Sequence, residues 1–111
     1  MSYIKAESLD QALDLLKEFA PEPRIIAGGT DLFLQDLPQN LIDIGSLKIM
    51  KMIEEKEGQL VIGAAVTHGM ATNAALIINK ATALAEACSQ VGSPQVRNIG
   101  TLGGNVMNAA P

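Results

Sequence analysis

Two glycine-rich stretches contain the residues best suited to bind a ligand. The first is Ile25-Ile26-Ala27-Gly28-Gly29-Thr30-Asp31-Leu32, and the second, at residues 97–105, contains Thr101-Leu102-Gly103-Gly104-Asn105. Glycine can adopt positive φ and lets another group approach the backbone with no Cβ in the way. Successive backbone N–H groups in such turns attract anions, phosphate in particular. The first stretch is therefore predicted to hold part of a phosphate-bearing cofactor.

Each stretch has a second interpretation. The first matches neither the P-loop nor the dinucleotide fingerprint G-x-G-x-x-G, and by itself it equally fits an ordinary strand-to-helix turn with Thr30 or Asp31 as the helix cap. The second equally fits a glycine turn, although four glycines fall within 13 residues and Thr101 and Asn105 add donors. A pyrophosphate needs donors on both sides, so the two stretches together favour a ligand site.

Three further side chains have chemistry of interest. Arg97 either contacts a phosphate or fixes its own loop by bonding carbonyls or a carboxylate, and the structural role is preferred. His68, the only histidine, has no partner at recognisable spacing and is expected to cap a helix or be solvated. Cys88, the only cysteine, lies on an apolar helical face and is expected in the core. No catalytic residue and no metal site is predicted, because no acid–base pair or metal-ligand spacing occurs.

Composition excludes several classes of function. The 111 residues are 48% hydrophobic, with three aromatic residues and a net charge of −4, which suits one small α/β layer fold packed with aliphatic side chains. Nucleic acid would need clustered Lys and Arg, which the sequence lacks. No signal peptide and no apolar run long enough to span a bilayer is apparent, so a cytoplasmic location is expected.

The pattern of apolar residues predicts alternating strands and helices. Ser8 with Gln11 three residues on is a helix-capping pattern, which predicts a helix over 8–20. The change from a parallel pair to a hairpin near residue 52 predicts a subdomain boundary there, and from Gln95 onward we expect a loop with one short strand or turn. The other expected elements are strands at 1–5, 24–27 and 41–44, helical turns at 31–36 and 46–50, a hairpin of 52–55 with 60–64, and helices at 67–75 and 82–91, with 76–79 unassigned.

The order of these segments resembles a known family. The first glycine stretch is followed by Leu-Ile-Asp-Ile at 41–44, Leu-Val-Ile-Gly-Ala at 60–64 and Val-Gly-Ser-Pro-Gln-Val-Arg-Asn-Ile-Gly-Thr-Leu-Gly-Gly-Asn at 91–105. This is similar to the FAD-binding subunit of the molybdenum hydroxylases, which include xanthine dehydrogenase, the aerobic carbon monoxide dehydrogenase medium subunit and nicotinate dehydrogenase. The resemblance covers essentially the whole chain.

The resemblance implies an α+β fold of α/β type, with FAD between two subdomains. Residues 1–52 correspond to the first, a small parallel β-sheet with helices. Residues 53–111 correspond to the start of the second, which is expected to be truncated, because family members continue past the final Ala-Pro. By position, the FAD-binding residues are Arg24, Ile25, Ile26, Ala27, Gly28, Gly29, Thr30 and Asp31 in the first loop, and Thr101, Leu102, Gly103, Gly104 and Asn105 in the second.

The resemblance also implies an oxidoreductase function. Electrons would pass from a molybdenum-cofactor subunit, through two-iron two-sulfur clusters on a small subunit, to FAD on this chain and then to NAD or another acceptor. The single cysteine agrees with clusters carried by a partner in a heteromeric complex. The alternative is a truncated, non-catalytic remnant or a binding or scaffold module that does not hold FAD.

Overall fold

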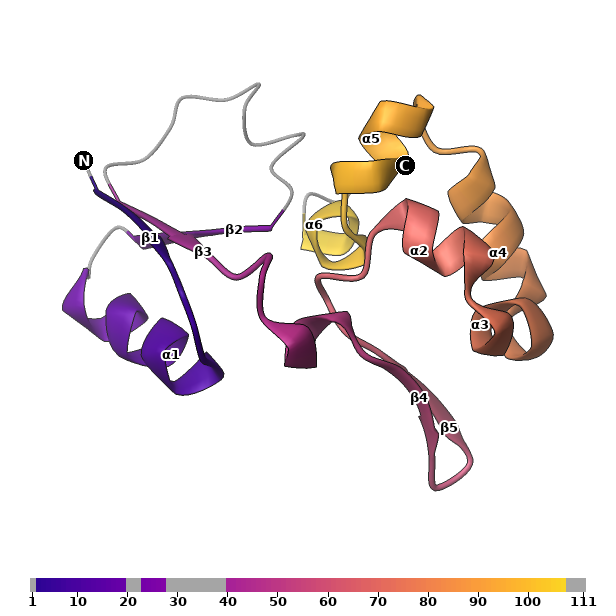
Figure 1. Ribbon diagram of the computed structural model, residues 1–111, viewed down its shortest axis with the longest axis horizontal. Helices are drawn as coiled ribbons and strands as arrows, with labels where there is room; N and C mark the ends of the chain where they lie inside the picture. The colour runs from indigo at the N-terminus through magenta and orange to yellow at the C-terminus, as the bar shows by residue number, and fades with distance from the viewer. Residues whose placement is uncertain (1, 20–22, 28–39, 108–111) are drawn as a thin grey trace.

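A computed structural model describes residues 2–19, 23–27 and 40–107 of the chain (Figure 1). Residues Gly28, Gly29, Thr30 and Asp31 of the first glycine stretch, and the helical turn expected at 31–36, lie outside the described residues. In the described part no helix is long and apolar enough to cross a membrane.

A three-stranded parallel sheet forms the N-terminal part of the structure. It consists of β1 (Ser2–Lys5), β2 (Pro23–Ile26) and β3 (Asn40–Asp43) in the order β1-β3-β2. Both outer strands run parallel to β3, which confirms the predicted parallel pair and the edge position of β1. Within β2, Ile26 is 6% exposed and Ile25 is 47% exposed, because adjacent side chains on a strand point to opposite faces.

Helix α1 (Leu9–Glu18) packs against this sheet. Ser8 Oγ accepts from Gln11 N at 3.0 Å, and Gln11 Oε1 accepts in return from Glu7 N at 2.6 Å, so the predicted helix start is confirmed. The helix contributes two residues to a buried cluster with the sheet, whose members are Ala6, Ala12, Leu15 and Ile42.

A hairpin follows a short 3-10 helix at Lys48–Lys51, which confirms the helical turn expected there. Strands β4 (Ile53–Lys56) and β5 (Gln59–Ile62) pair antiparallel, with Lys56 opposite Gln59. The connecting residues Glu57 and Gly58 have φ of 52° and 78°. Positive φ at both positions gives the turn the twist that a two-residue hairpin requires. The predicted hairpin with its bend at Gly58 is therefore confirmed.

Three helices form a second core, and the second of them packs against both strands of the hairpin. They are α2 (His68–Asn73), α3 (Ala75–Lys80) and α4 (Thr82–Ser89), and α3 occupies the stretch left unassigned from the sequence. Cys88 is 2% exposed in this core, as predicted. The buried members of this cluster are Val66, Ala71, Ile77, Ala85 and Cys88, and Ile53, Leu60 and Ile62 of the hairpin pack against them.

The C-terminal part is helical, so the expectation of a loop after Gln95 is wrong. Helices α5 (Pro94–Ile99) and α6 (Leu102–Met107) occupy this region. Ser93 Oγ accepts from Val96 N at 3.2 Å, and Pro94 occupies the first turn of α5. Proline is favoured at that position because its fixed φ suits a helix and its missing N–H would have had no helical partner. The Ser93-Pro94 pair follows the end of α4 and also starts α5.

Candidate functional site

The second glycine stretch is fixed against the segment at residues 64–68. His68 N donates to Gly100 O at 3.0 Å, Leu102 N to Val66 O at 2.9 Å, and Gly103 N to Ala64 O at 2.9 Å. Thr67 and Thr101 form an isolated antiparallel bridge in the middle of these bonds. Because Val66 belongs to the second core, the glycine stretch is tied directly to buried structure.

Thr101 joins the second glycine stretch to the first. Its hydroxyl Oγ1 donates to Ala27 O at 3.2 Å and accepts from Gly104 N at 3.0 Å, and the residue is 5% exposed. Ala27 directly precedes Gly28, so this contact places the end of β2 beside the start of α6 (Figure 1). Two predicted site residues that are 74 positions apart in the sequence are thus in contact.

The other described residues of the first stretch belong to β2. Ile26 is buried against the sheet core and its carbonyl accepts from Ile44 N at 3.0 Å. Arg24 and Ile25 are exposed on this edge strand. Thus β2 leads the chain to the contact at Ala27, and its exposed side chains lie on the sheet edge.

The backbone N–H groups of the second stretch already have acceptors inside the chain. Besides the bonds of Leu102 and Gly103, Gly104 N donates to Thr101 Oγ1 and Asn105 N donates to Thr101 O at 3.0 Å. In the described residues the side-chain amide of Asn105 has no hydrogen-bond partner, and the residue is half-buried. The donor that this stretch offers a ligand is therefore the Asn105 side chain rather than the row of backbone N–H groups.

The two glycines of this stretch have different roles. A Cβ on Gly103 would lie 2.7 Å from Ala64 O and 2.8 Å from Ala64 Cβ, so the fold itself requires a glycine there. A Cβ on Gly104 would meet Thr101 Oγ1 at 3.0 Å and, among the described residues, no other atom within 4 Å outside its chain neighbours and its own helix backbone. Gly104 is exposed, and it is the position where a ligand can approach the backbone closely.

Arg97 has the structural role that the sequence favoured. Its Nη1 donates to Val91 O at 3.1 Å and to Gly92 O at 3.2 Å, which ties α5 to the residues that follow α4. Val91 and Gly92 follow the C-cap of α4 at Gln90, so Arg97 bonds the backbone of the turn between α4 and α5.

His68 differs from expectation. It is 5% exposed, and the cap of α2 is Thr67, whose Oγ1 accepts from Met70 N at 3.1 Å. Within the described residues, the buried Nδ1 of His68 has no hydrogen-bond partner, and it faces Gly100, where a Cβ would lie 3.2 Å away. The sequence signal for burial was its spacing from Ala71, which is three residues on and lies on the same inward side of α2.

A metal site is not found in the part of the chain at 2–19, 23–27 and 40–107, where no three His, Cys, Asp or Glu side chains gather. Burial raises the pKa of the Cys88 thiol above its ordinary value, which suits a core residue and not a reactive one.

The family of FAD-binding domains in molybdopterin dehydrogenases matches residues 1–111, which is the whole chain. The chain belongs to this family. The match confirms FAD as the cofactor associated with the domain.

Known FAD-binding subunits are similar to this chain over nearly its whole length. The chain is 39% identical over 114 residues to the nicotinate dehydrogenase FAD-subunit of Eubacterium barkeri, covering 97% of this chain and 38% of that protein. It is 34% identical to the xanthine dehydrogenase FAD-binding subunit of Escherichia coli O157:H7, covering 98% and 39%. The chain thus spans about two fifths of the length of these relatives.

The fold of this FAD-binding domain agrees with solved structures. Reconstituted CO dehydrogenase from Oligotropha carboxidovorans contains a chain that superposes with a TM-score of 0.92 at 27% identity, covering 97% of this chain and 40% of that one. The α+β fold with a small parallel sheet is therefore confirmed.

Proposed function

We propose that this chain is the N-terminal part of an FAD-binding electron-transfer subunit in a molybdenum-containing hydroxylase. In such a complex, electrons reach FAD from iron–sulfur clusters and leave to NAD or another acceptor. The observation that carries the proposal is the hydrogen bond from Thr101 Oγ1 to Ala27 O at 3.2 Å. It supports a single binding face made by both glycine stretches, which is what a diphosphate between two loops requires.

The proposed site divides the work among its residues. Gly28 and Gly29, with Thr30 and Asp31, supply backbone N–H groups to the diphosphate. Ala27 and Thr101 hold the two loops together, Gly104 admits the cofactor close to the backbone, and the Asn105 amide donates to it. Bound FAD would supply the redox chemistry, and the chain would bind and orient it.

The two core clusters support the proposed subdomains at 1–52 and 53–111. One cluster contains Ile42 and α1 residues, and the other contains Val66 and residues of α2 to α4. The proposed partners are a molybdenum-cofactor subunit and a two-iron two-sulfur subunit, in the cytoplasm. These 111 residues cannot hold the clusters themselves, because they include one cysteine and that residue is buried.

A chimera tests the proposal. The matching 38% of the Eubacterium barkeri subunit is replaced by this chain, because the two align over 97% of it. The expected product is a folded flavoprotein that contains one FAD per polypeptide, measured by flavin absorbance against protein concentration. A chimera with native-like circular dichroism and no flavin would favour the non-catalytic binding module.

Two variants of the chimera test the loops. Gly28→Val places a branched side chain in the first loop and is expected to abolish flavin retention. Asn105→Ala removes the free amide donor and is expected to weaken FAD binding about tenfold, which is the effect of one hydrogen bond to a charged group. Asn79→Ala, at an exposed position of α3, is the matched control and should change nothing. Full flavin content in both loop variants would show that the loops are assigned wrongly.

A further inference from the structure

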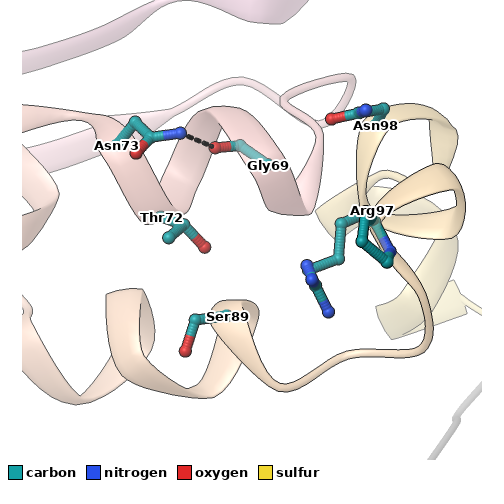
Figure 2. A pocket seen from close by; sticks show the side chains of 7 residues that line it. Gly69, Thr72, Asn73, Ser89, Arg97 and Asn98 are labelled. Carbon is teal, nitrogen blue, oxygen red and sulfur yellow. Dashed lines mark hydrogen bonds between the residues drawn. The ribbon is translucent and has the colours of Figure 1, made fainter.

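A polar pocket lies between α2, α4 and α5, and none of the residues that line it is among the proposed FAD-binding residues (Figure 2). Its volume is about 210 Å³, below the 300 to 1,000 Å³ typical of sites for drug-sized ligands and cofactors. It is therefore suited to a small molecule of a few heavy atoms. The residues that line it include Gly69, Thr72, Asn73, Ser89, Arg97 and Asn98.

The pocket carries one positive charge and no negative one. Among the described residues, Arg97 is the charged residue of its lining, and no acidic side chain contributes to it. In the part of the chain that the structure describes, Arg97 forms no ion pair; the pair found there joins Lys80 Nζ to Glu55 Oε2 at 3.4 Å. Within the described ranges, the guanidinium is thus a cation without a counter-charge, beside a cavity.

The guanidinium is already oriented. Its Nη1 is held by the carbonyls of Val91 and Gly92, while its other nitrogens have no acceptor among the described residues. Figure 2 shows the side chain reaching toward the space between α2 and α4. A planar fork of donors fixed in this way matches the oxygens of a carboxylate or phosphate, and little side-chain freedom remains to be lost on binding.

Hydrogen-bond acceptors face the same space. Thr72 Oγ1 donates its proton to His68 O at 3.0 Å, and Ser89 Oγ donates to Glu86 O at 2.6 Å. A hydroxyl whose proton is committed still has a lone pair to accept with. The pocket therefore combines the charged donors of Arg97 with hydroxyl acceptors. A ligand that has only acceptor atoms could bond the guanidinium but could not donate to these hydroxyls.

We propose that this pocket binds a small oxyanion that also carries a hydroxyl group, with the negative oxygens on Arg97 and the O–H directed to Thr72. Hydrogen phosphate and short hydroxy acids share this chemistry. The lining shares no residue with the proposed FAD site, so a test of this pocket is independent of the proposed flavin function.

The test is a titration of the full chain followed by two-dimensional amide NMR at constant ionic strength. The probes form two pairs: phosphate against sulfate, which has no proton near neutral pH, and glycolate against acetate, which lacks the hydroxyl. Saturable shifts are expected at residues 69–73, 89, 97 and 98. The hydroxyl-bearing member of each pair should bind about 3- to 10-fold tighter, the effect of one neutral hydrogen bond. A preference in the first pair alone identifies phosphate as the ligand class, and in the second pair alone a hydroxy acid.

Three variants separate binding from folding. Ser89→Asp places a carboxylate opposite Arg97 without touching its bonds to Val91 and Gly92, and it should abolish binding, whereas Ser89→Ala should retain it. Thr72→Val should keep binding but remove the preference within each pair. The proposal is overturned if phosphate and glycolate give no saturable shifts in the folded chain, if neither pair shows a preference, or if Ser89→Asp binds as the parent does.

Discussion

The Thr101 hydroxyl lies 3.2 Å from the Ala27 carbonyl oxygen and joins the parallel sheet to the helical part of the chain. It also accepts from Gly104 N at 3.0 Å. At 5% exposure, neither bond is easily replaced by water. One buried side chain thus fixes the relative positions of the residues that lead into both glycine loops.

Replacing Thr101 tests this connection directly. Thr101→Val keeps the shape but leaves the Ala27 carbonyl and the Gly104 N–H without their partner, so we expect a loss of about 1–3 kcal/mol in the free energy of unfolding. In the flavoprotein chimera the same change should lower FAD content. Thr101→Ser retains the hydroxyl and should behave much more like the parent. Urea unfolding and flavin absorbance check the pair; equal behaviour of the Val and parent proteins would contradict the role of the hydroxyl.

The adjacent glycines are expected to respond differently to the same substitution. Gly103→Ala brings a Cβ to 2.7 Å from Ala64 O, and such overpacking costs about 1–3 kcal/mol, or a decrease in Tm of roughly 4–8 °C per kcal/mol in a domain of this size. Gly104→Ala meets Thr101 Oγ1 at 3.0 Å and should cost less stability. In the chimera Gly104→Ala should reduce FAD affinity clearly, while Tm changes little. The result against this assignment would be a larger Tm decrease for Gly104→Ala than for Gly103→Ala.

The sequence was sufficient for the elements that carry a regular local pattern. Ser8 with Gln11, the apolar strand expected at 41–44 and the Gly58 bend each correspond to a feature of the structure. It was not sufficient after Gln95, where helices of six residues are too short to show a period. There the helix starts, Ser93-Pro94 and Thr101, were the available signal.

The candidate site was only partly predictable for a different reason. Glycine pairs indicated where a ligand approaches the backbone, but Gly103 is required by Ala64, which lies 39 positions earlier in the sequence. The burial of His68 likewise depends on Gly100, which packs on its ring. Such long-range contacts have no local signature, so the sequence identified the loops and the structure separated their packing residues from their exposed ones.

The start of α5 offers a test of the corrected C-terminal region. Ser93→Ala removes the acceptor for Val96 N, and loss of a helix cap costs about 1 kcal/mol. Ser93→Asp keeps an acceptor at the same position and should restore most of that stability. Thermal unfolding of the three proteins measures the difference. Indistinguishable Tm values for Ser93→Ala and the parent would mean that the cap contributes nothing.

Cys88 predicts a dependence of stability on pH. Burial raises the pKa of its thiol above the ordinary 9.0, so in alkaline solution the unfolded chain loses this proton first. The contribution of the Cys88 thiol to the free energy of unfolding is fully present below about pH 9. It is lost as the pH rises from there through the raised pKa of the folded state. Urea unfolding from pH 8 upward should show this decline for the parent and a smaller one for Cys88→Ala. Equal slopes would rule out the thiol as the cause.

The folded thiol should also resist alkylation. Iodoacetamide reacts with the thiolate, and Cys88 is 2% exposed with a raised pKa. Labelling measured by mass spectrometry is expected to be slow in buffer and fast in denaturant. Rapid labelling without denaturant would show that the helical core opens readily at α4.

The internal hydrogen bonds of residues 102–105 have a consequence for the order of assembly. Since all four backbone N–H groups are satisfied within the chain, this loop holds its shape without help from a cofactor. A cofactor that docks on it has no ordering entropy to overcome on that side, which favours binding by a rigid, preformed surface. The second glycine stretch would therefore present its side of the proposed FAD site as the chain folds, before any flavin arrives.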